Sequence, residues 1–161
     1  MKFGIISDTH DHLDHIHSAK LLFASHNVEY IIHLGDYVAP FSLRLFQGIK
    51  LYGVFGNNDG DRIRLLGVAR DIGAELMGDF YSFDEDSLSF ACYHGTDSAI
   101  TSALIRSGQY DVVLCGHTHQ AVQEQIGKTL FINPGTAHGT GHRASVVIFD
   151  TLTKLPTFLD L

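Results

Sequence analysis

Short runs of β-branched and other apolar residues recur along this chain, and each ends at a residue that can bind a metal ion. In residues 112–119, Val-Val-Leu-Cys is followed by Gly116 and then by two histidines, His117 and His119. The apolar run predicts a short buried strand, and Gly116 allows a sharp turn where the strand leaves the sheet. In extended backbone, residues two apart point to the same side, so we expect both imidazoles to share one face. Such a pair predicts half of a transition-metal site, although two surface histidines in a turn would give the same pattern.

Four other apolar runs end in the same way. Each has the length of a strand and stops at a residue with an oxygen or nitrogen donor. These donors are Asp8 and His10 after residues 2–7, Asp36 after residues 30–34, Asn57 after residues 51–55, and His94 after residues 89–93. In α/β folds, ligands bind at the carboxyl ends of the strands. We therefore expect these side chains to meet His117 and His119 in one pocket.

The donor set at the five strand ends combines carboxylate, amide and imidazole groups. It is larger than one ion needs and suits two ions that share one carboxylate. Mixed oxygen and nitrogen donors favour Mn, Fe, Co, Ni or Zn over Ca or Mg.

Composition limits the class of protein and its partners. With 161 residues, of which 45% are hydrophobic, the chain can bury about 70% of its unfolded surface, and we expect one domain over residues 1–161. The net charge of −7 argues against an extended nucleic-acid surface, which needs clustered Lys and Arg. The first apolar run is too short for a signal peptide, and no run approaches membrane-spanning length, so we expect a cytoplasmic protein without a membrane partner. Cys92 and Cys115 lie in apolar runs, which indicates buried reduced thiols.

Helices are expected between the strands. The first should begin after Asp11, which can cap it. Others are expected from Pro40, over residues 61–70, and after Asp97 as a cap. The buried face of the first helix is predicted to hold Leu13, Ile16, Ala19 and Phe23.

The second half of the chain contains shorter strands. Those predicted over residues 74–93 are separated by acidic turn residues, which favours an antiparallel arrangement. Gly127-Lys128 predicts a hairpin between two further strands, and residues 136–143 are the least regular stretch.

Several histidines lie outside the strand ends. His33 falls within an apolar run, so we expect a hydrogen-bonded core residue. His15, His17 and His26 are expected on a solvated helix face, whereas His12 lies close enough to the first strand end to stay open.

Five segments of the chain, taken in order, resemble the five motifs of calcineurin-like metallophosphoesterases. They are Asp8-Thr9-His10, Gly35-Asp36, Gly56-Asn57-Asn58-Asp59, His94-Gly95 and Gly116-His117-Thr118-His119. The chain length and Asn133-Pro134-Gly135 are most similar to the small prokaryotic YfcE-type phosphodiesterase branch. The resemblance implies an α/β (α+β) fold, a four-layer αββα sandwich of two mixed sheets flanked by helices.

The resemblance also implies two divalent transition-metal ions, manganese first, with nickel, iron, cobalt or zinc as alternatives. One ion would be bound by Asp8, His10, Asp36 and His119, and the other by Asp36, Asn57, His94 and His117. Asp36 would bridge them. A hydroxide between the ions would then attack a phosphate ester directly and in line, without a phosphoenzyme. Asp36, Asn57, Asn58, His94 and Arg143 are the candidate catalytic residues.

Position 58 departs from the family pattern. Many members carry a histidine there that assists the leaving group, and the amide of Asn58 cannot act as a general acid. His12, His138 and His142 are candidate substitutes, each equally expected at the surface. Arg143 is the candidate phosphate contact, because a guanidinium binds phosphate in bidentate fashion.

Three functions are compatible with this resemblance. The leading prediction is a phosphodiesterase acting on a small substrate, and a phosphomonoesterase with the same metals is the nearest alternative. The third is a non-catalytic interaction scaffold, since a retromer subunit uses this fold. All seven ligand positions keep ligand-capable side chains, which favours an enzyme. The resemblance leaves a homodimer open.

Overall fold

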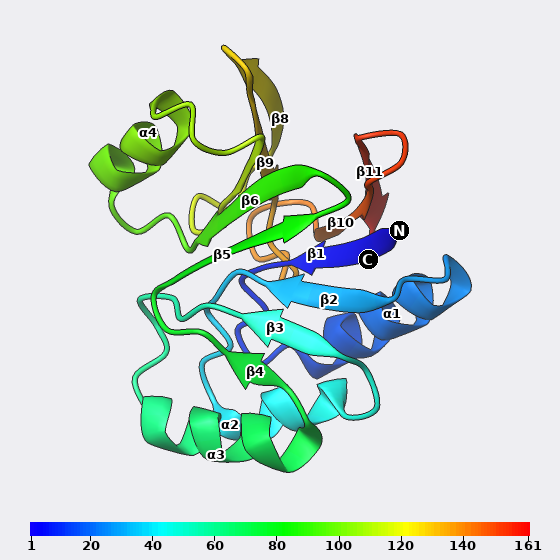
Figure 1. Cartoon of the computed structure of the whole chain (residues 1–161). Helices are drawn as coiled ribbons and strands as arrows, with labels where there is room; N and C mark the ends of the chain where they lie inside the picture. The colour runs from blue at the N-terminus through cyan, green and yellow to red at the C-terminus, as the bar shows by residue number, and fades with distance from the viewer.

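The computed structural model describes residues 1–161 as two β-sheets packed face to face, with helices on both outer faces (Figure 1). The six-stranded first sheet has the order β11-β10-β1-β2-β3-β4, and the five-stranded second sheet has the order β5-β6-β7-β9-β8. The first sheet contains β1 (Lys2–Ile6), β2 (Tyr30–His33), β3 (Leu51–Gly53), β4 (Glu75–Leu76), β10 (Ser145–Asp150) and β11 (Leu155–Asp160). The second contains β5 (Phe80–Glu85), β6 (Leu88–Tyr93), β7 (Val112–Leu114), β8 (Ala121–Ile126) and β9 (Thr129–Pro134).

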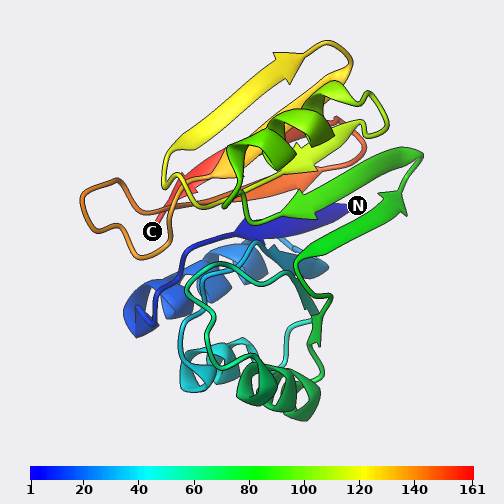
Figure 2. The same ribbon diagram turned by 90° about the vertical axis from the view of Figure 1, so that its left-hand side faces the viewer.

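The helices divide unequally between the two sheets. They are α1 (Leu13–Ser25), α2 (Pro40–Leu43), the 3₁₀ helix η1 (Arg44–Phe46), α3 (Arg62–Ile72) and α4 (Ser98–Arg106). Helices α1, α2 and α3 lie on the first sheet, and α4 lies on the second (Figures 1 and 2). The predicted αββα sandwich is therefore confirmed.

The core between the sheets is rich in aromatic side chains. Phe3 of β1 stacks on Tyr30 with ring centroids 5.1 Å apart, and it meets Phe90 of the second sheet edge-on at 5.4 Å. Alternation along the strand turns Ile6 to the other face, where it packs among residues of the helices. Strand β1, like its neighbours β2 and β10, therefore buries both faces and joins the helix layer to the inter-sheet core.

Parallel pairing brings the strand ends together. Strands β1, β2 and β3 are parallel neighbours, and so are β6, β7 and β9. The antiparallel arrangement predicted for residues 74–93 is confirmed for β5 and β6 but is wrong in two places: β4 pairs parallel with β3, and β6 pairs parallel with β7. The reason is a helical crossover in each case, α3 between β3 and β4 and α4 between β6 and β7, which returns the chain to the same end of the sheet.

The helix caps were predicted correctly at one helix and wrongly at another. Asp97 Oδ1 accepts the N–H groups of Ala99 at 2.8 Å and Ile100 at 3.4 Å, as expected for α4. Helix α1 is capped by His12 instead of Asp11, because the Asp11 carboxylate accepts the N–H of Ala39 at 3.0 Å.

The buried face of α1 is one residue shorter than predicted. Ile16, Ala19 and Phe23 are buried, but Leu13 in the first turn is 43% exposed. The turn Gly127-Lys128 joins β8 to β9 as predicted. None of the helices is long and apolar enough to cross a membrane.

Candidate metal centre

The structure brings the seven predicted ligand residues to one edge of the sandwich. His10 Nε2 lies 3.3 Å from Asp36 Oδ2, and His94 Nε2 lies 3.5 Å from the same oxygen. His119 Nε2 lies 3.1 Å from Asp8 Oδ1. The remaining two residues adjoin His94. Asn57 Oδ1 lies 3.1 Å from His94 Nε2, and the ring centroids of His117 and His94 are 5.2 Å apart.

Backbone at these strand ends is left-handed, which the sequence did not indicate. Asp8, His10, Asp36, His117 and His119 have φ angles of 53°, 38°, 60°, 66° and 60°. The expectation of extended backbone at the two histidines of the last motif is therefore wrong, because β7 ends before the motif begins. The rings of these two histidines contact different neighbours. A non-glycine residue with left-handed backbone costs conformational energy, and such residues cluster at functional sites.

Two glycines permit the close approach of the strand ends. A Cβ on Gly56 would lie 2.1 Å from Asp36 Oδ1, and one on Gly116 would lie 1.9 Å from Ser7 Oγ. No side chain fits in these positions. In these two motifs the glycine before the ligand therefore makes room for a carboxylate from another strand end, that of Asp36 at Gly56 and that of Asp8 at Gly116.

The two carboxylates remain charged although they are buried. Asp8 is 0% exposed and Asp36 is 1% exposed. Burial acts to raise both pKa values, but contacts with His10, together with Ser7 at Asp8 and His94 at Asp36, lower the pKa of both carboxyls. In return, Asp36 first and Asp8 second raise the pKa of His10 to about 9. The negative charge of the two carboxylates is therefore balanced at this site either by a proton on His10 or by a metal ion that takes its place.

Histidine 94 faces the centre with a lone pair. Its Nδ1–H donates to Leu34 O at 2.7 Å, which leaves Nε2 without a proton in the neutral ring. Nε2 then faces two further acceptors, Asn57 Oδ1 and Asp36 Oδ2, with no hydrogen between them. Burial acts to lower the pKa of His94, but Asp36 outweighs burial and raises it. Either a second proton or a metal ion must fill this gap.

The donor set therefore fits a transition-metal ion. The buried His10 Nε2 has no hydrogen-bond partner although it lies beside two carboxylates. Carboxylate oxygens and imidazole nitrogens are the ligands such ions accept, and the set Asp8, His10 and Asp36 offers donor atoms within 4.8 Å of one another.

Asp59 supports the site, although the third motif, which contains it, gave it no role. Its carboxylate accepts the backbone N–H groups of Asp36 at 2.9 Å, Val38 at 2.9 Å and Gly56 at 2.8 Å. It is 3% exposed. Asp59 therefore fixes the backbone that carries the central carboxylate. Its place in Asn-Asn-Asp-Gly was the only available signal, and turn chemistry explained that equally well.

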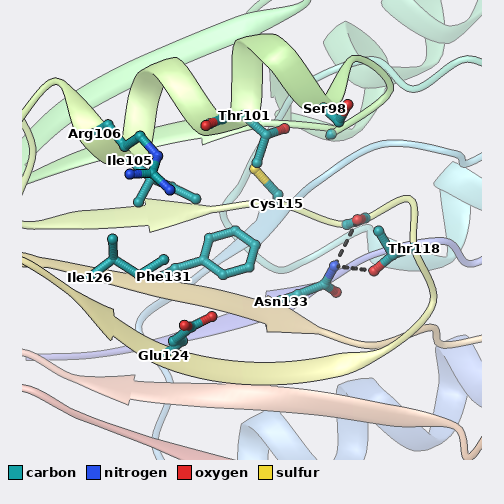
Figure 3. A pocket seen from close by; sticks show the side chains of 13 residues that line it. Ser98, Thr101, Ile105, Arg106, Cys115, Thr118, Glu124, Ile126, Phe131 and Asn133 are labelled. Carbon is teal, nitrogen blue, oxygen red and sulfur yellow. Dashed lines mark hydrogen bonds between the residues drawn. The ribbon is translucent and has the colours of Figure 1, made fainter.

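Asn133 has the corresponding role in the second sheet. Its Nδ2 donates to Gly116 O at 2.7 Å and to Thr118 Oγ1 at 3.0 Å, as Figure 3 shows. Its Oδ1 accepts the N–H of Gly135 at 2.9 Å. This side chain therefore fixes the turn that carries the last two histidines. It also borders a cavity of about 250 Å³ between α4 and the second sheet.

Asn58 is bound to the central carboxylate. Its backbone N–H donates to Asp36 Oδ1 at 2.8 Å, and its Nδ2 donates to Asp36 Oδ2 at 2.7 Å. Asn58 therefore orients the proposed bridging group, a contact the sequence could not indicate.

Arg143 lies beside the centre and not in it. Its side chain is 80% exposed and pairs with the carboxylate of Asp160. It lines a surface cavity together with His119 and His142. Its predicted contact with phosphate remains a prediction.

Four further histidines were assigned from the sequence, and His17 and His26 are exposed as predicted. His33 is a hydrogen-bonded core residue, as predicted: its Nδ1 accepts the Gly35 N–H at 3.1 Å, and its Nε2–H donates to Thr9 Oγ1 at 3.1 Å. Burial lowers the pKa of His33 to about 3. The solvated face predicted for His15 is wrong, because its Nδ1–H donates to Ala137 O at 2.6 Å.

Comparison with known proteins agrees with this geometry. Residues 1–154 match the calcineurin-like phosphoesterase superfamily domain. The chain is 43% identical over 142 residues to phosphodiesterase MJ0936 of Methanocaldococcus jannaschii, covering 86% of each protein. It matches the structure of a novel archaeal phosphodiesterase with a TM-score of 0.94 and 40% identity over 100% of both chains. The E. coli phosphoesterase YfcE shares the fold, with a TM-score of 0.71 and 19% identity over 99% of each chain. The chain therefore belongs to the calcineurin-like phosphoesterase superfamily, as its five motifs predicted.

Proposed function

We propose that this protein is a metal-dependent phosphodiesterase that hydrolyses a small phosphodiester. Family membership supports a phosphoesterase, and the name of the relative from Methanocaldococcus jannaschii supports a diester substrate. The net charge of −7 argues against a long nucleic acid as that substrate.

The observation that carries the proposal is the position of Asp36. One oxygen, Oδ2, lies 3.3 Å from His10 Nε2 and 3.5 Å from His94 Nε2, so the carboxylate stands between the two proposed ligand groups. Such a carboxylate can serve two cations at once. We assign one ion to Asp8, His10, Asp36 and His119, and the other to Asp36, Asn57, His94 and His117.

Two bound ions would lower the pKa of a water between them and neutralise the phosphoryl oxygens, so that the water attacks phosphorus in line. The protein itself supplies the orientation. Asn58 and Asp59 fix Asp36 from its side-chain and backbone ends, and Leu34 O holds His94 with Nε2 toward the centre. Groups held in this way need no rearrangement as charge builds on the phosphate.

Leaving-group dependence should follow from the amide at position 58. Since the Nδ2 of Asn58 donates to Asp36 and the amide has no acidic proton, expulsion of a poor leaving group would rely on the metals or on another donor. We expect aryl diesters such as bis(p-nitrophenyl) phosphate to react much faster than alkyl diesters. Asn58→His would supply an acid at the cost of the bond to Asp36, so any gain should be confined to poor leaving groups.

The test is a panel of aryl and alkyl diesters and monoesters, assayed with protein reconstituted separately with Mn, Ni, Fe, Co and Zn. Elemental analysis of the same samples should give two ions per chain with the active metal. Faster turnover of monoesters than of matched diesters would instead assign a phosphomonoesterase. Absence of turnover with every metal at full occupancy would leave the interaction scaffold.

A further inference from the structure

The irregular segment 136–143 carries His138, whose position the five motifs do not explain. The backbone N–H of His138 donates to Asp8 O at 3.0 Å, and Thr136 Oγ1 donates to the same oxygen at 3.1 Å. Figure 2 shows this segment, in orange, beside the blue segment that follows β1. The start of the segment is therefore fixed to the residue that begins the metal centre.

The ring of His138 packs against two proposed ligands. Its centroid lies 4.6 Å from that of His10 and 4.9 Å from that of His119. Its Nε2 is buried and has no hydrogen-bond partner. Its Nδ1 accepts the N–H of Thr140 at 3.1 Å, across a turn at Gly139, where φ is 77°. The two neighbouring rings and the hydrogen bond from Thr140 therefore fix the orientation of the His138 ring, and its Nε2 has no hydrogen-bond partner.

The hydrogen bond from Thr140 decides which nitrogen holds the proton. A neutral imidazole has one N–H and one lone pair. Because Nδ1 of His138 uses its lone pair on Thr140, Nε2 carries the hydrogen. His94 shows the opposite arrangement, since its Nδ1–H donates to Leu34 O and leaves Nε2 with the lone pair. His94 therefore offers a ligand atom, whereas His138 offers a donor.

Binding of a metal by His138 would conflict with this arrangement. His10, His119 and His138 do offer donor atoms within 4.8 Å of one another. To bind through Nε2 as a neutral ring, however, His138 would have to move its proton to Nδ1 and give up the bond from Thr140. An anionic oxygen at Nε2 requires no such change.

We propose that His138 binds substrate, donating its Nε2–H to a non-bridging oxygen of the phosphoryl group. This role rests on the proposed phosphoesterase function and adds an imidazole donor beside Asn58, whose backbone N–H and Nδ2 both donate to Asp36. A buried N–H without an acceptor is unfavourable, and the phosphoryl oxygen supplies the acceptor. A donor placed in advance of the reaction acts on the transition state as well as on the bound ester.

Two substitutions separate the donor from the turn. In His138→Asn the side-chain oxygen can still accept the N–H of Thr140, but no group reaches the Nε2 position. In His138→Gln the amide can place an N–H near that position. We expect kcat for an activated diester to fall by about 10²-fold in His138→Asn and to be largely retained in His138→Gln.

Metal content and phosphate binding provide readouts that do not depend on turnover. Both variants should hold as many metal ions as wild type, because His138 is not a ligand. Calorimetry with inorganic phosphate should show about tenfold weaker binding to metal-loaded His138→Asn than to wild type. In the metal-free protein, nitrogen-15 NMR of the imidazole should report the Nε2–H tautomer.

Several results would overturn the inference. Wild-type phosphate affinity in His138→Asn, loss of a metal ion from it, an Nδ1–H tautomer, or no phosphate binding by the loaded wild type would each do so. Failure of the proposed function looks different. Loaded wild type would bind phosphate and hydrolyse no ester, and the comparison of phosphate affinities would still decide the role of His138.

Discussion

The two sheets contribute different chemistry to one centre. Strand ends of the first sheet supply both carboxylates and the amide, namely Asp8, Asp36 and Asn57, whereas those of the second supply only imidazoles. The carboxylates are 0% and 1% exposed, but His117 and His119 are partly exposed. Fixed charge is therefore built into the first sheet, and the second adds neutral ligands. The proposed metal ions would be bound by residues of both sheets, and we expect substitutions in the first sheet to reduce activity more than those in the second.

Removal of the central charge should have the largest effect. We expect Asp36→Asn to lower kcat/KM on the order of 10³-fold and to lose at least one metal ion, because the amide cannot balance two cations. Circular dichroism and elemental analysis check the fold and the metal content. Asn57→Ala in the same sheet, which removes a neutral ligand, is the matched control and should cost less. Equal losses in the two variants would contradict the importance assigned to charge.

Next in size are the two residues that hold the motif turns. Asp59→Asn and Asn133→Asp each exchange an amide and a carboxylate, so the substitutions match in size and reverse in charge. Each should weaken metal binding by about 10–100-fold, as outer-shell changes do. Asp59→Asn should be the more severe, because three backbone N–H groups lose a charged acceptor. Metal titration by calorimetry measures both, and a reversed order would place the rigid half of the centre in the second sheet.

A neutral buried histidine makes the first sheet sensitive to acid. The pKa of His33 is about 3 in the folded protein against 6.5 in the unfolded chain, so the unfolded state binds more protons between these values. Stability therefore falls as pH falls through this window, by about 1.4 kcal/mol per pH unit. In metal-free protein, wild type should lose about 2–3 kcal/mol more than His33→Gln between about pH 6 and pH 4. Urea denaturation measures this, and parallel losses would show that His33 does not titrate as described.

The smallest effect is expected at the exposed edge of the centre, where Arg143 pairs with Asp160 of β11. Arg143→Ala should raise KM about twofold to fivefold, because an exposed guanidinium contributes little in water. Asp160→Asn releases Arg143 from its ion pair and should lower KM. Thermal denaturation should show both variants folded. Unchanged kinetics in both variants would show that Arg143 is an ordinary surface residue that does not contact substrate.

The sequence was most informative where local chemistry decides the outcome. An apolar run that stops at a donor residue located all five strand ends, and Asp97 identified the start of α4. It was least informative where partners come from distant segments. Asp11 was expected to cap α1, but its carboxylate meets Ala39. Asp59 looked like a turn residue in the local sequence, because the three N–H groups that donate to it lie at two separate strand ends and become its neighbours only in the fold.

The second sheet shows a related limit. Alternation along a strand predicts burial, but it does not say whether the next strand runs the same way, which depends on the connection between them. Whether Nε2 of His138 is a metal ligand or a hydrogen-bond donor depends in the same way on Thr140 and on a metal centre formed by other strands. Residue type alone cannot separate a ligand nitrogen from a donor nitrogen, because both are histidines.

Left-handed backbone at five ligand positions has an evolutionary consequence. Glycine adopts this conformation without the steric cost that a side chain brings, a saving of up to about 1 kcal/mol at each position. The free energy of unfolding of natural domains is only about 5–15 kcal/mol, so five such differences in conformational energy are large by comparison. A lineage released from hydrolysis would gain stability by losing Asp8, His10, Asp36, His117 and His119. Retaining these residues would therefore require selection for catalysis, and the sandwich without them would be a more stable platform for other uses.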